Sequence, residues 1–282
     1  MKKLVEILAW IGNRIGKPPG WERVVRWFAP PEKCLSMREI CVVRDSIAFL
    51  AQPSIPIGWH IAFFGTYEPE SRAIFRAILP VGGVALDVGA NVGWHTLLMA
   101  RLVGDSGLVL AAEPNPSVRR RLEANLKLNR FGQVKVIPYA IAAIEGNVEF
   151  YGPEADDADS GNGHITTASA TGQSSVYRVE TRRLDAILPV AKITRLDLIK
   201  IDVEGYEWPV LNGATQTIAK FRPHIVFEYN AEYTSRGEGS AQLLWQFFQQ
   251  NHYRLFAIGR NWAEEVQLNN GSSANQMGVL KG

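Results

Sequence analysis

Residues 84–93 read Val-Ala-Leu-Asp-Val-Gly-Ala-Asn-Val-Gly, and Glu113 follows twenty residues after the last glycine. The first apolar run carries an acid, Asp87, near its end, and then breaks into a turn of small residues before a helical pattern begins. A second apolar run, residues 108–112, leads directly into Glu113. This order predicts a strand–helix–strand unit that binds a nucleoside-type ligand at its turn.

The two acids narrow the choice of ligand. Glu113 can accept both hydrogen bonds of a ribose diol, while the glycines let the backbone pass close to a ligand. Asp87 would repel the pyrophosphate of a dinucleotide but would attract a cation. S-adenosylmethionine carries an ammonium, a sulfonium and a free ribose diol, and it has no phosphate. The residues therefore favour this cofactor over NAD, although an NAD-type oxidoreductase remains a rival hypothesis.

Composition sets broad limits on the class of protein. The 282 residues are 46% hydrophobic, which suits one large or two small globular domains. The formal net charge is +2 without a long single-sign run, so nucleic acid is not expected as the main partner. Cys34 and Cys41 lack metal-ligand spacing and favour a reduced, cytoplasmic setting over a disulfide framework. No stretch approaches the roughly 20 apolar residues that span a bilayer.

Residues 1–66 are interpreted as an N-terminal extension of helices and a β-hairpin. Residues 1–30 predict two short helices broken at residues 17–20, and residues 38–65 predict strands with a hairpin turn at Arg44-Asp45-Ser46. Glu6 interrupts the first apolar run, so no signal peptide is expected. The first helix is expected to pack on the body of the protein; the alternative is an interfacial membrane helix, a peripheral contact. Its apolar face would comprise Leu4, Ile7, Leu8, Ile11 and Ile15.

Residues 67–282 are interpreted as the main domain. Alternating strand and helix patterns predict an α/β fold with a doubly wound sheet of about seven strands and an antiparallel hairpin at one edge. Residues 152–175 are polar and predict a lid or a disordered segment. The expected helices are 67–79, 92–103, 116–130, 208–221 and 239–250. The expected strands are 84–89, 108–113, 134–141, 147–151, 196–202, 224–229, 253–259 and 276–280.

A second group of polar residues follows two later strands. Lys200 lies within an apolar strand that leads into Asp202 and Glu204, and Glu228 ends the strand expected beside it. Lys200 needs a partner, because an unpaired buried charge is costly; the partner is either a structural acid such as Glu228 or the substrate. Two acids at adjacent strand ends can share a proton, which raises one pKa and suits a general base.

Other polar residues receive more modest interpretations. Asn91 could cap the following helix or hold the amino-acid end of the cofactor. Trp94 and His95 are expected to pack in the first helical turn. His164 is expected to be solvated. No metal ligand set is assigned, but a metal-assisted reaction using Asp202 and other acids stays open.

The motifs together resemble the FkbM family of S-adenosylmethionine-dependent methyltransferases, over about residues 67–228. The matching segments are Leu-Asp-Val-Gly-Ala-Asn-Val-Gly (86–93), Glu-Pro-Asn-Pro (113–116), Asn-Leu-Lys-Leu-Asn (125–129), Ile-Lys-Ile-Asp-Val-Glu-Gly-Tyr-Glu (199–207) and Leu-Asn-Gly-Ala (211–214), with Leu122, Leu184 and Asp185. The resemblance implies a class I methyltransferase fold, which is Rossmann-like, and an O-methylation activity.

The resemblance also implies where the cofactor lies. The methionine end would be held by Asp87, Gly89, Ala90, Asn91 and Gly93. Glu113 would hold the ribose, and residues around Ala140 and Ile141 would border the adenine. Pro114 and Asp202 complete the expected cofactor set.

The expected reaction is O-methylation of a hydroxyl on a sugar, glycan or natural product. Asp202 or Glu228 is the candidate base, Lys200 would orient it, and Glu204 would hold a substrate hydroxyl. The expected partner is a small-molecule or glycan acceptor, and the oligomeric state is left open. A nucleic-acid methyltransferase is disfavoured, because the chain has no Asn-Pro-Pro-aromatic element and no basic stripe. The main alternative is a non-catalytic nucleoside-binding module.

Overall fold

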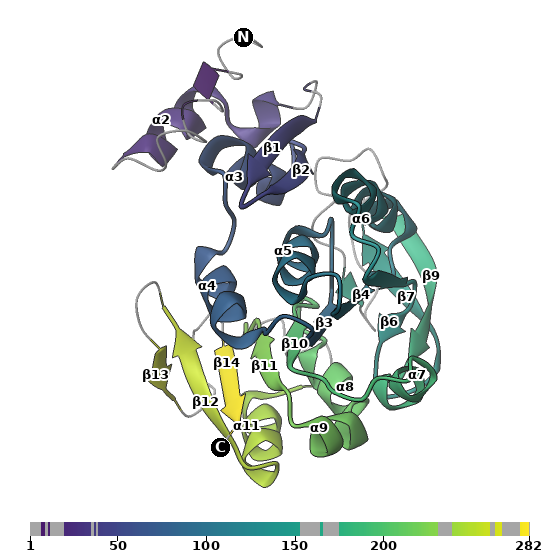
Figure 1. The fold of residues 1–282 in the computed structure, drawn as a ribbon. Helices are drawn as coiled ribbons and strands as arrows, with labels where there is room; N and C mark the ends of the chain where they lie inside the picture. The colour runs from purple at the N-terminus through teal and green to yellow at the C-terminus, as the bar shows by residue number, and fades with distance from the viewer. Residues whose placement is uncertain are drawn as a thin grey trace.

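An eight-stranded sheet lies at the centre of the computed structural model (Figure 1). The structure describes residues 7–8, 11, 20–34, 37, 39–152, 164–165, 175–230, 239–259, 263–266 and 277–281. Five parallel strands lie in the order β5-β4-β3-β10-β11, and the order reverses between β3 and β10, which is where doubly wound sheets bind ligands. They are β3 (Val84–Val88), β4 (Leu108–Ala112), β5 (Val134–Ile137), β10 (Leu198–Ile201) and β11 (His224–Phe227).

Helices cover both faces of this sheet, because its buried strands present apolar side chains to each side in alternation. One face packs against α4 (Pro69–Ile78), α5 (Trp94–Val103) and α6 (Pro116–Asn129). The other face packs against α7 (Leu184–Val190), α8 (Glu207–Asn212), α9 (Thr215–Phe221) and α11 (Ala241–Gln250). The predicted helix 208–221 is thus two helices, which meet at Gly213 and Ala214.

The far edge of the sheet is antiparallel. The strands β12 (Tyr253–Ile258) and β14 (Met277–Lys281) pair antiparallel, as predicted, but β14 lies between β11 and β12. A short strand, β13 (Ala263–Glu265), extends the sheet beyond β12. The sheet therefore has one strand more than the seven predicted, since the three residues of β13 carry two acids and no strand pattern.

A second sheet borders the first, with strand order β6-β9-β7-β8. Its strands are β6 (Ala140–Ile141), β7 (Gly146–Gly152), β8 (His164–Ile165) and β9 (Ser175–Arg182). The predicted strand 134–141 is divided between the two sheets, because Pro138 has no N–H for a ladder. Sequence reasoning missed β9 and α7. Apart from residues 164–165 and the ends at 152 and 175, the predicted lid lies outside the described residues.

The N-terminal region differs most from its prediction. The hairpin of β1 (Ile40–Arg44) and β2 (Ile47–Ala51) is confirmed, and α2 (Trp21–Phe28) follows Gly20. The strand prediction is wrong for α3 (Pro56–Phe64), a helix with Pro56 at its start and left-handed Gly65 after its end. Its run is apolar on all sides, and such a run does not distinguish a buried helix from a strand.

Only part of the predicted N-terminal helix can be compared with the structure. Within the predicted apolar face, Leu8 is buried and Ile7 is exposed, while Leu4 and Ile15 lie outside the described residues. Among the described residues, no helix is both long enough and apolar enough to cross a membrane.

Two asparagines of α6 attach the hairpin to the main sheet layer. Asn129 accepts a hydrogen bond from the Ala48 amide at 2.8 Å and donates to the Ala48 carbonyl at 2.6 Å. Asn125 accepts from the Leu50 amide at 2.9 Å and donates to the Val92 carbonyl at 2.9 Å. The side chains of α6 thus satisfy backbone groups of β2 as a neighbouring strand would.

Replacing Asn125 by Ala should destabilise the protein, because it leaves the Leu50 amide and the Val92 carbonyl without their partner. The expected loss in free energy of unfolding is about 2–4 kcal/mol, measured by denaturant unfolding. Glu123→Ala, on the exposed side of the same helix, is the matched control. Equal stability of both variants would show that water replaces these bonds without cost.

Candidate active site

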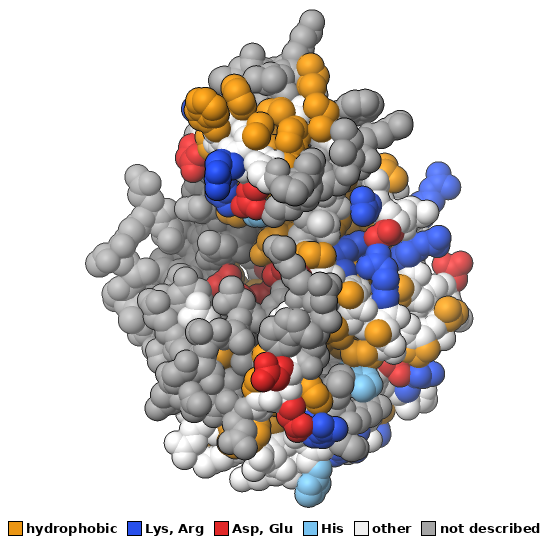
Figure 2. Space-filling view, turned by 90° about the vertical axis from the view of Figure 1, so that its left-hand side faces the viewer, with side chains coloured by type: hydrophobic (Ala, Val, Ile, Leu, Met, Phe, Trp, Pro, Cys, Tyr) orange, Lys and Arg blue, Asp and Glu red, His pale blue; other side chains and the backbone are white. Residues whose placement is uncertain are grey.

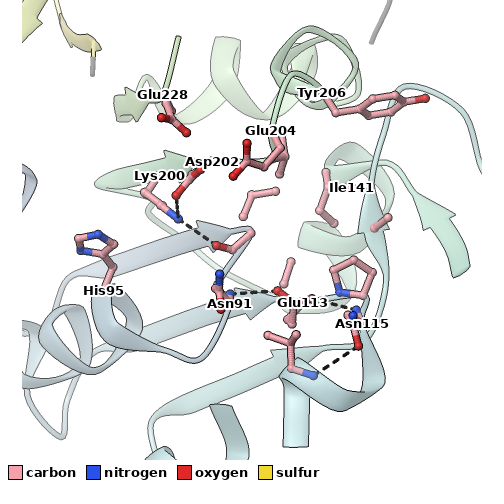
Figure 3. Close-up of a pocket in the computed structure, with 18 of the residues that line it drawn as sticks. Asn91, His95, Glu113, Asn115, Ile141, Lys200, Asp202, Glu204, Tyr206 and Glu228 are labelled. Carbon is pink, nitrogen blue, oxygen red and sulfur yellow. Dashed lines mark hydrogen bonds and ion pairs between the residues drawn. The ribbon is translucent and has the colours of Figure 1, made fainter. Parts of the chain in front are cut away.

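A pocket opens at the carboxyl ends of β3, β4, β10 and β11, where the sheet order reverses (Figure 3). Most residues predicted for the site line this pocket: Gly89, Ala90, Asn91, Glu113, Pro114, Ala140, Ile141, Lys200, Asp202, Glu204 and Glu228. Asp87 and Gly93 are not among the lining residues. Eleven of the thirteen predicted site residues therefore line one pocket, as expected for residues near the carboxyl ends of neighbouring parallel strands.

Lys200 is buried at the back of the pocket, and its ammonium lies close to three oxygen atoms. Its Nζ lies 2.9 Å from the Gly89 carbonyl oxygen, 3.1 Å from Asp202 Oδ2 and 3.3 Å from Asp87 Oδ1. Burial lowers the pKa of Lys200, but the charges of Asp202 and Asp87 outweigh this and hold the pKa above its ordinary value. The expected partner Glu228 is therefore replaced by Asp87 and Asp202 in direct contact.

Asp87 supports the pocket from behind. It stands beside Lys200 in the register of the parallel strands β3 and β10, and its side chain is fully buried. Its Oδ2 accepts a hydrogen bond of 2.6 Å from the Thr96 hydroxyl of α5. Asp87 was expected to attract the positive charge of the cofactor, whereas in this structure it pairs with the ammonium of Lys200.

The two glycines of the motif serve close packing of the chain. Gly89 has φ +75°, and a Cβ there would collide with the Asp202 carbonyl oxygen at the end of β10. Gly93 has φ +93°, and a Cβ there would press on Leu122 of α6. Gly89 thus lets the β3 turn meet the β10 strand end beside the pocket, whereas Gly93 lets α5 pack closely on α6.

Glu113 ends β4 with its carboxylate on the pocket wall. Its Oε2 accepts from the Asn91 amide at 2.9 Å and its Oε1 from the Asn115 amide at 2.8 Å. Burial raises the pKa of Glu113 to about 7, against the opposing effect of these two bonds. Since a carboxylate has about four acceptor positions, two remain for a ligand diol.

The wall beside Glu113 combines an amide with apolar side chains. Asn115 is the N-cap of α6, and its Oδ1 accepts from Ser117 and Val118 amides. Its buried Nδ2 has no acceptor among the residues that the structure describes. Asn91 does not cap α5; its Oδ1 accepts from the Val92 amide, and the N-cap is Gly93. The apolar members of this wall are Ala112, Pro114, Val118, Ala140 and Ile141.

Three carboxyl groups meet at the other end of the pocket. One oxygen each from Asp202, Glu204 and Glu228 lies within 4.8 Å of the other two (Figure 3). Burial and the negative charge of Asp202 raise the pKa of Glu228 to about 9. Burial also tends to raise the pKa of Asp202. The charge of Lys200 and a hydrogen bond from Glu228 outweigh this effect, so the pKa of Asp202 lies below its ordinary value. At neutral pH, Glu228 is therefore the protonated partner of an ionised Asp202.

Sequence reasoning missed several residues at this end. Trp94 and His95 are buried, as expected, but both also line the pocket, together with Tyr67 and Glu68. His95 Nε2 lies 3.1 Å from Glu68 Oε2, and the Trp94 indole donates to the Tyr67 carbonyl at 2.9 Å. Trp94 and His95 directly follow the turn after β3, and this position in the sequence could have predicted that they line the pocket. Glu68 precedes β3 by a whole helix, and nothing local marks it.

The fold and this pocket define an S-adenosylmethionine-dependent methyltransferase. The family model described as the methyltransferase FkbM domain matches residues 87–255, more than half of the chain. The chain belongs to this FkbM family, and the resemblance read from its motifs is confirmed.

Three relatives illustrate the range of similar proteins. The AMB antimetabolite synthetase AmbE of Pseudomonas aeruginosa is 29% identical over 59% of this chain, but the match spans only 9% of that protein. The 2-O-methyltransferase NoeI of Sinorhizobium fredii is 28% identical over 55% of this chain and 66% of its own. The hexuronic acid methyltransferase AglP of Haloferax volcanii is 26% identical over 63% of this chain and 70% of its own.

The buried carboxyls should make stability depend on pH. The pKa values of Glu113 and Glu207 are raised to about 7, and that of Glu228 to about 9, in each case chiefly by burial. The folded state then binds more protons than the unfolded state above about pH 4.5, so these groups lose their stabilising effect as the pH rises to 9. Denaturant unfolding between pH 5 and pH 9 should show this fall.

Glu228→Gln should flatten the part of this profile between about pH 7 and pH 9. Glu123→Gln, which changes an exposed carboxyl, is the control and should leave the profile unchanged. An unaltered profile in Glu228→Gln would mean that Glu228 is ionised at neutral pH.

Proposed function

We propose that the chain transfers a methyl group from S-adenosylmethionine to a hydroxyl of a sugar, glycan or natural product. The observation that carries the proposal is the pair of neighbouring carboxyl groups, Asp202 and Glu228, at the pocket. Methyl transfer to a hydroxyl needs a group that accepts the hydroxyl proton, and a carboxylate at the strand ends can do so. Of the relatives, the 2-O-methyltransferase supports transfer to an oxygen, and the hexuronic acid methyltransferase supports a sugar acceptor.

On this proposal, Glu113 and the wall around it bind the nucleoside of the cofactor. Its free acceptor positions suit the ribose diol, and the Asn115 amide offers a further donor. Ala140 and Ile141 give an apolar surface for the adenine, while the turn of Gly89, Ala90 and Asn91 borders the methionine end. The bound cofactor supplies an activated methyl group, so the protein has mainly to align the acceptor. Alignment can contribute roughly 7–11 kcal/mol to lowering the barrier.

At the other end, the carboxyl pair removes the proton of the acceptor hydroxyl. Asp202 and Glu228 titrate as a unit, so the pair accepts one proton whichever oxygen takes it. Lys200 positions Asp202 through its 3.1 Å ion pair and does not itself exchange a proton, because its pKa is raised. Glu204 lies close enough to both acids to hold a second acceptor hydroxyl. General-base help of this kind contributes about 10²–10⁴-fold.

The charge of this end favours an uncharged acceptor. Four carboxyl groups line it, from Glu68, Asp202, Glu204 and Glu228, and the ammonium of Lys200 is already paired. A uronic acid would bring a further negative charge into this region, at a cost that grows as water is excluded. A neutral hydroxylated acceptor is therefore the better fit.

Cofactor affinity should depend on the charge of Glu113. Glu113→Gln should weaken binding of S-adenosylmethionine about 10- to 100-fold, because a charge-assisted hydrogen bond to the diol is worth about 1.5–3 kcal/mol. Isothermal titration calorimetry measures this, with Glu123→Gln as the control for an exposed carboxyl. The parent should not bind NAD tightly. Tight NAD binding without a response to S-adenosylmethionine would contradict the cofactor assignment.

Turnover should depend on the carboxyl pair more than cofactor affinity does. Asp202→Asn should lower the rate about 10²–10⁴-fold if it is the base, and Glu228→Gln tests the other member. The assay is transfer of labelled methyl to a panel of neutral glycosides, with the matching uronic acid glycosides alongside. Full activity in both variants would mean that neither carboxyl is the base. Catalysis would then depend on alignment of the acceptor only, on His95 as the base, or on a cation held by the acids. Comparing EDTA-treated with Mg²⁺-supplied enzyme, and assaying His95→Gln, distinguishes these three explanations.

A further inference from the structure

The helix α2 presents a row of large apolar side chains to solvent. Trp27 is 77% exposed, Phe28 46% and Val24 39%. Their spacing places them on one side of the helix, and the rings of Trp27 and Phe28 lie 5.3 Å apart between centroids. Figure 2 shows hydrophobic side chains gathered at the upper end of the molecule, where Figure 1 places α2. We call Val24, Trp27 and Phe28 the α2 face.

Positive charge is concentrated in the part of the sequence that contains this face. Arg23 and Arg26 of α2 are both exposed. Residues 1–33 contain seven Lys or Arg against three Glu, in a chain whose whole formal charge is only +2. The remainder of the chain is therefore slightly acidic, and the N-terminal region is its basic end.

We propose that the α2 face binds an anionic lipid surface. Tryptophan and phenylalanine beside basic residues are the pattern of helices that lie in the plane of a membrane interface. The apolar rings enter the boundary between headgroups and acyl chains, while the basic side chains attract acidic headgroups. The charge of residues 1–33 complements such a surface.

A second copy of the chain fits this face less well. Stable protein interfaces bury about 1,200–2,000 Å² in total, far more than three side chains on a helix of eight residues provide. In a two-fold dimer the same surface faces itself, so Arg23 and Arg26 would approach their own copies. The like charges would oppose the contact.

The helix that carries the α2 face packs against α3, and α3 forms part of one wall of the pocket. The Trp59 indole of α3 donates to the Ala29 carbonyl just after α2 at 2.7 Å, and the Arg26 guanidinium lies 5.0 Å from the ring centre of Trp59. The same helix α3 carries Pro56 and Ile57, which line the pocket. Attachment through α2 would therefore hold the pocket in a fixed relation to the lipid surface.

Co-sedimentation of the full chain with lipid vesicles tests the proposal. We expect binding to vesicles of phosphatidylcholine mixed with phosphatidylglycerol, weaker binding to phosphatidylcholine alone, and a loss of binding as salt rises. Trp27→Ala should lower the partition coefficient about tenfold. Ile144→Ala removes a side chain that is 77% exposed outside the α2 face, and it should bind like the parent.

Three results would overturn the proposal. The first is an absence of binding to the mixed vesicles, and the second is unchanged binding by Trp27→Ala. The third is a dimer in light scattering that Trp27→Ala dissociates, which would assign the face to a second copy. Thermal unfolding of each variant shows that the change acts on binding and not on folding.

Discussion

The ammonium of Lys200 sets the arrangement of everything around it. It joins the middle of β10 to Asp87 of β3, to the turn carbonyl of Gly89 and to the acid at its own strand end. Because two carboxylates pair with the ammonium and the Gly89 carbonyl accepts a hydrogen bond from it, the charge is tolerated between two buried strands. Removing the lysine would leave Asp87 buried without compensation, a situation that commonly costs about 3–5 kcal/mol. The position of Asp202 is thus fixed by the same contacts that hold the two central strands.

That constraint gives the two ends of the pocket opposite characters. Around Glu113, backbone amides and apolar side chains surround one carboxyl, which suits recognition of a nucleoside. Around Asp202, carboxyl groups outnumber the one cation, and the surplus charge is relieved by keeping a proton on Glu228. Proton sharing therefore follows from crowding acids at adjacent strand ends and does not need a specialised motif.

The sequence predicted the parts of the site that depend on local pattern and strand order. Glu113, Asp202 and Glu228 end parallel strands, so the sheet brings them together once the strands are recognised. The strand order does not reveal which acid contacts Lys200, because that depends on register: Asp87 is its direct neighbour and Glu228 is not. Glu68, which directly precedes α4, also lines the pocket. The helix α3 shows no helical periodicity in its sequence, because its residues are apolar on all sides. Both depend on tertiary packing, which no local pattern records.

The attachment of β2 to α6 has a consequence for the nascent chain. The amides of Ala48 and Leu50 find their acceptors in asparagines 81 and 75 residues further on. A ribosome adds about 5–20 residues per second, so the hairpin is made several seconds before the helix that completes its hydrogen bonds. During that interval one edge of β2 remains open to pairing with other strands. The hairpin therefore completes its hydrogen bonds only after β3, β4 and α6 have been synthesised.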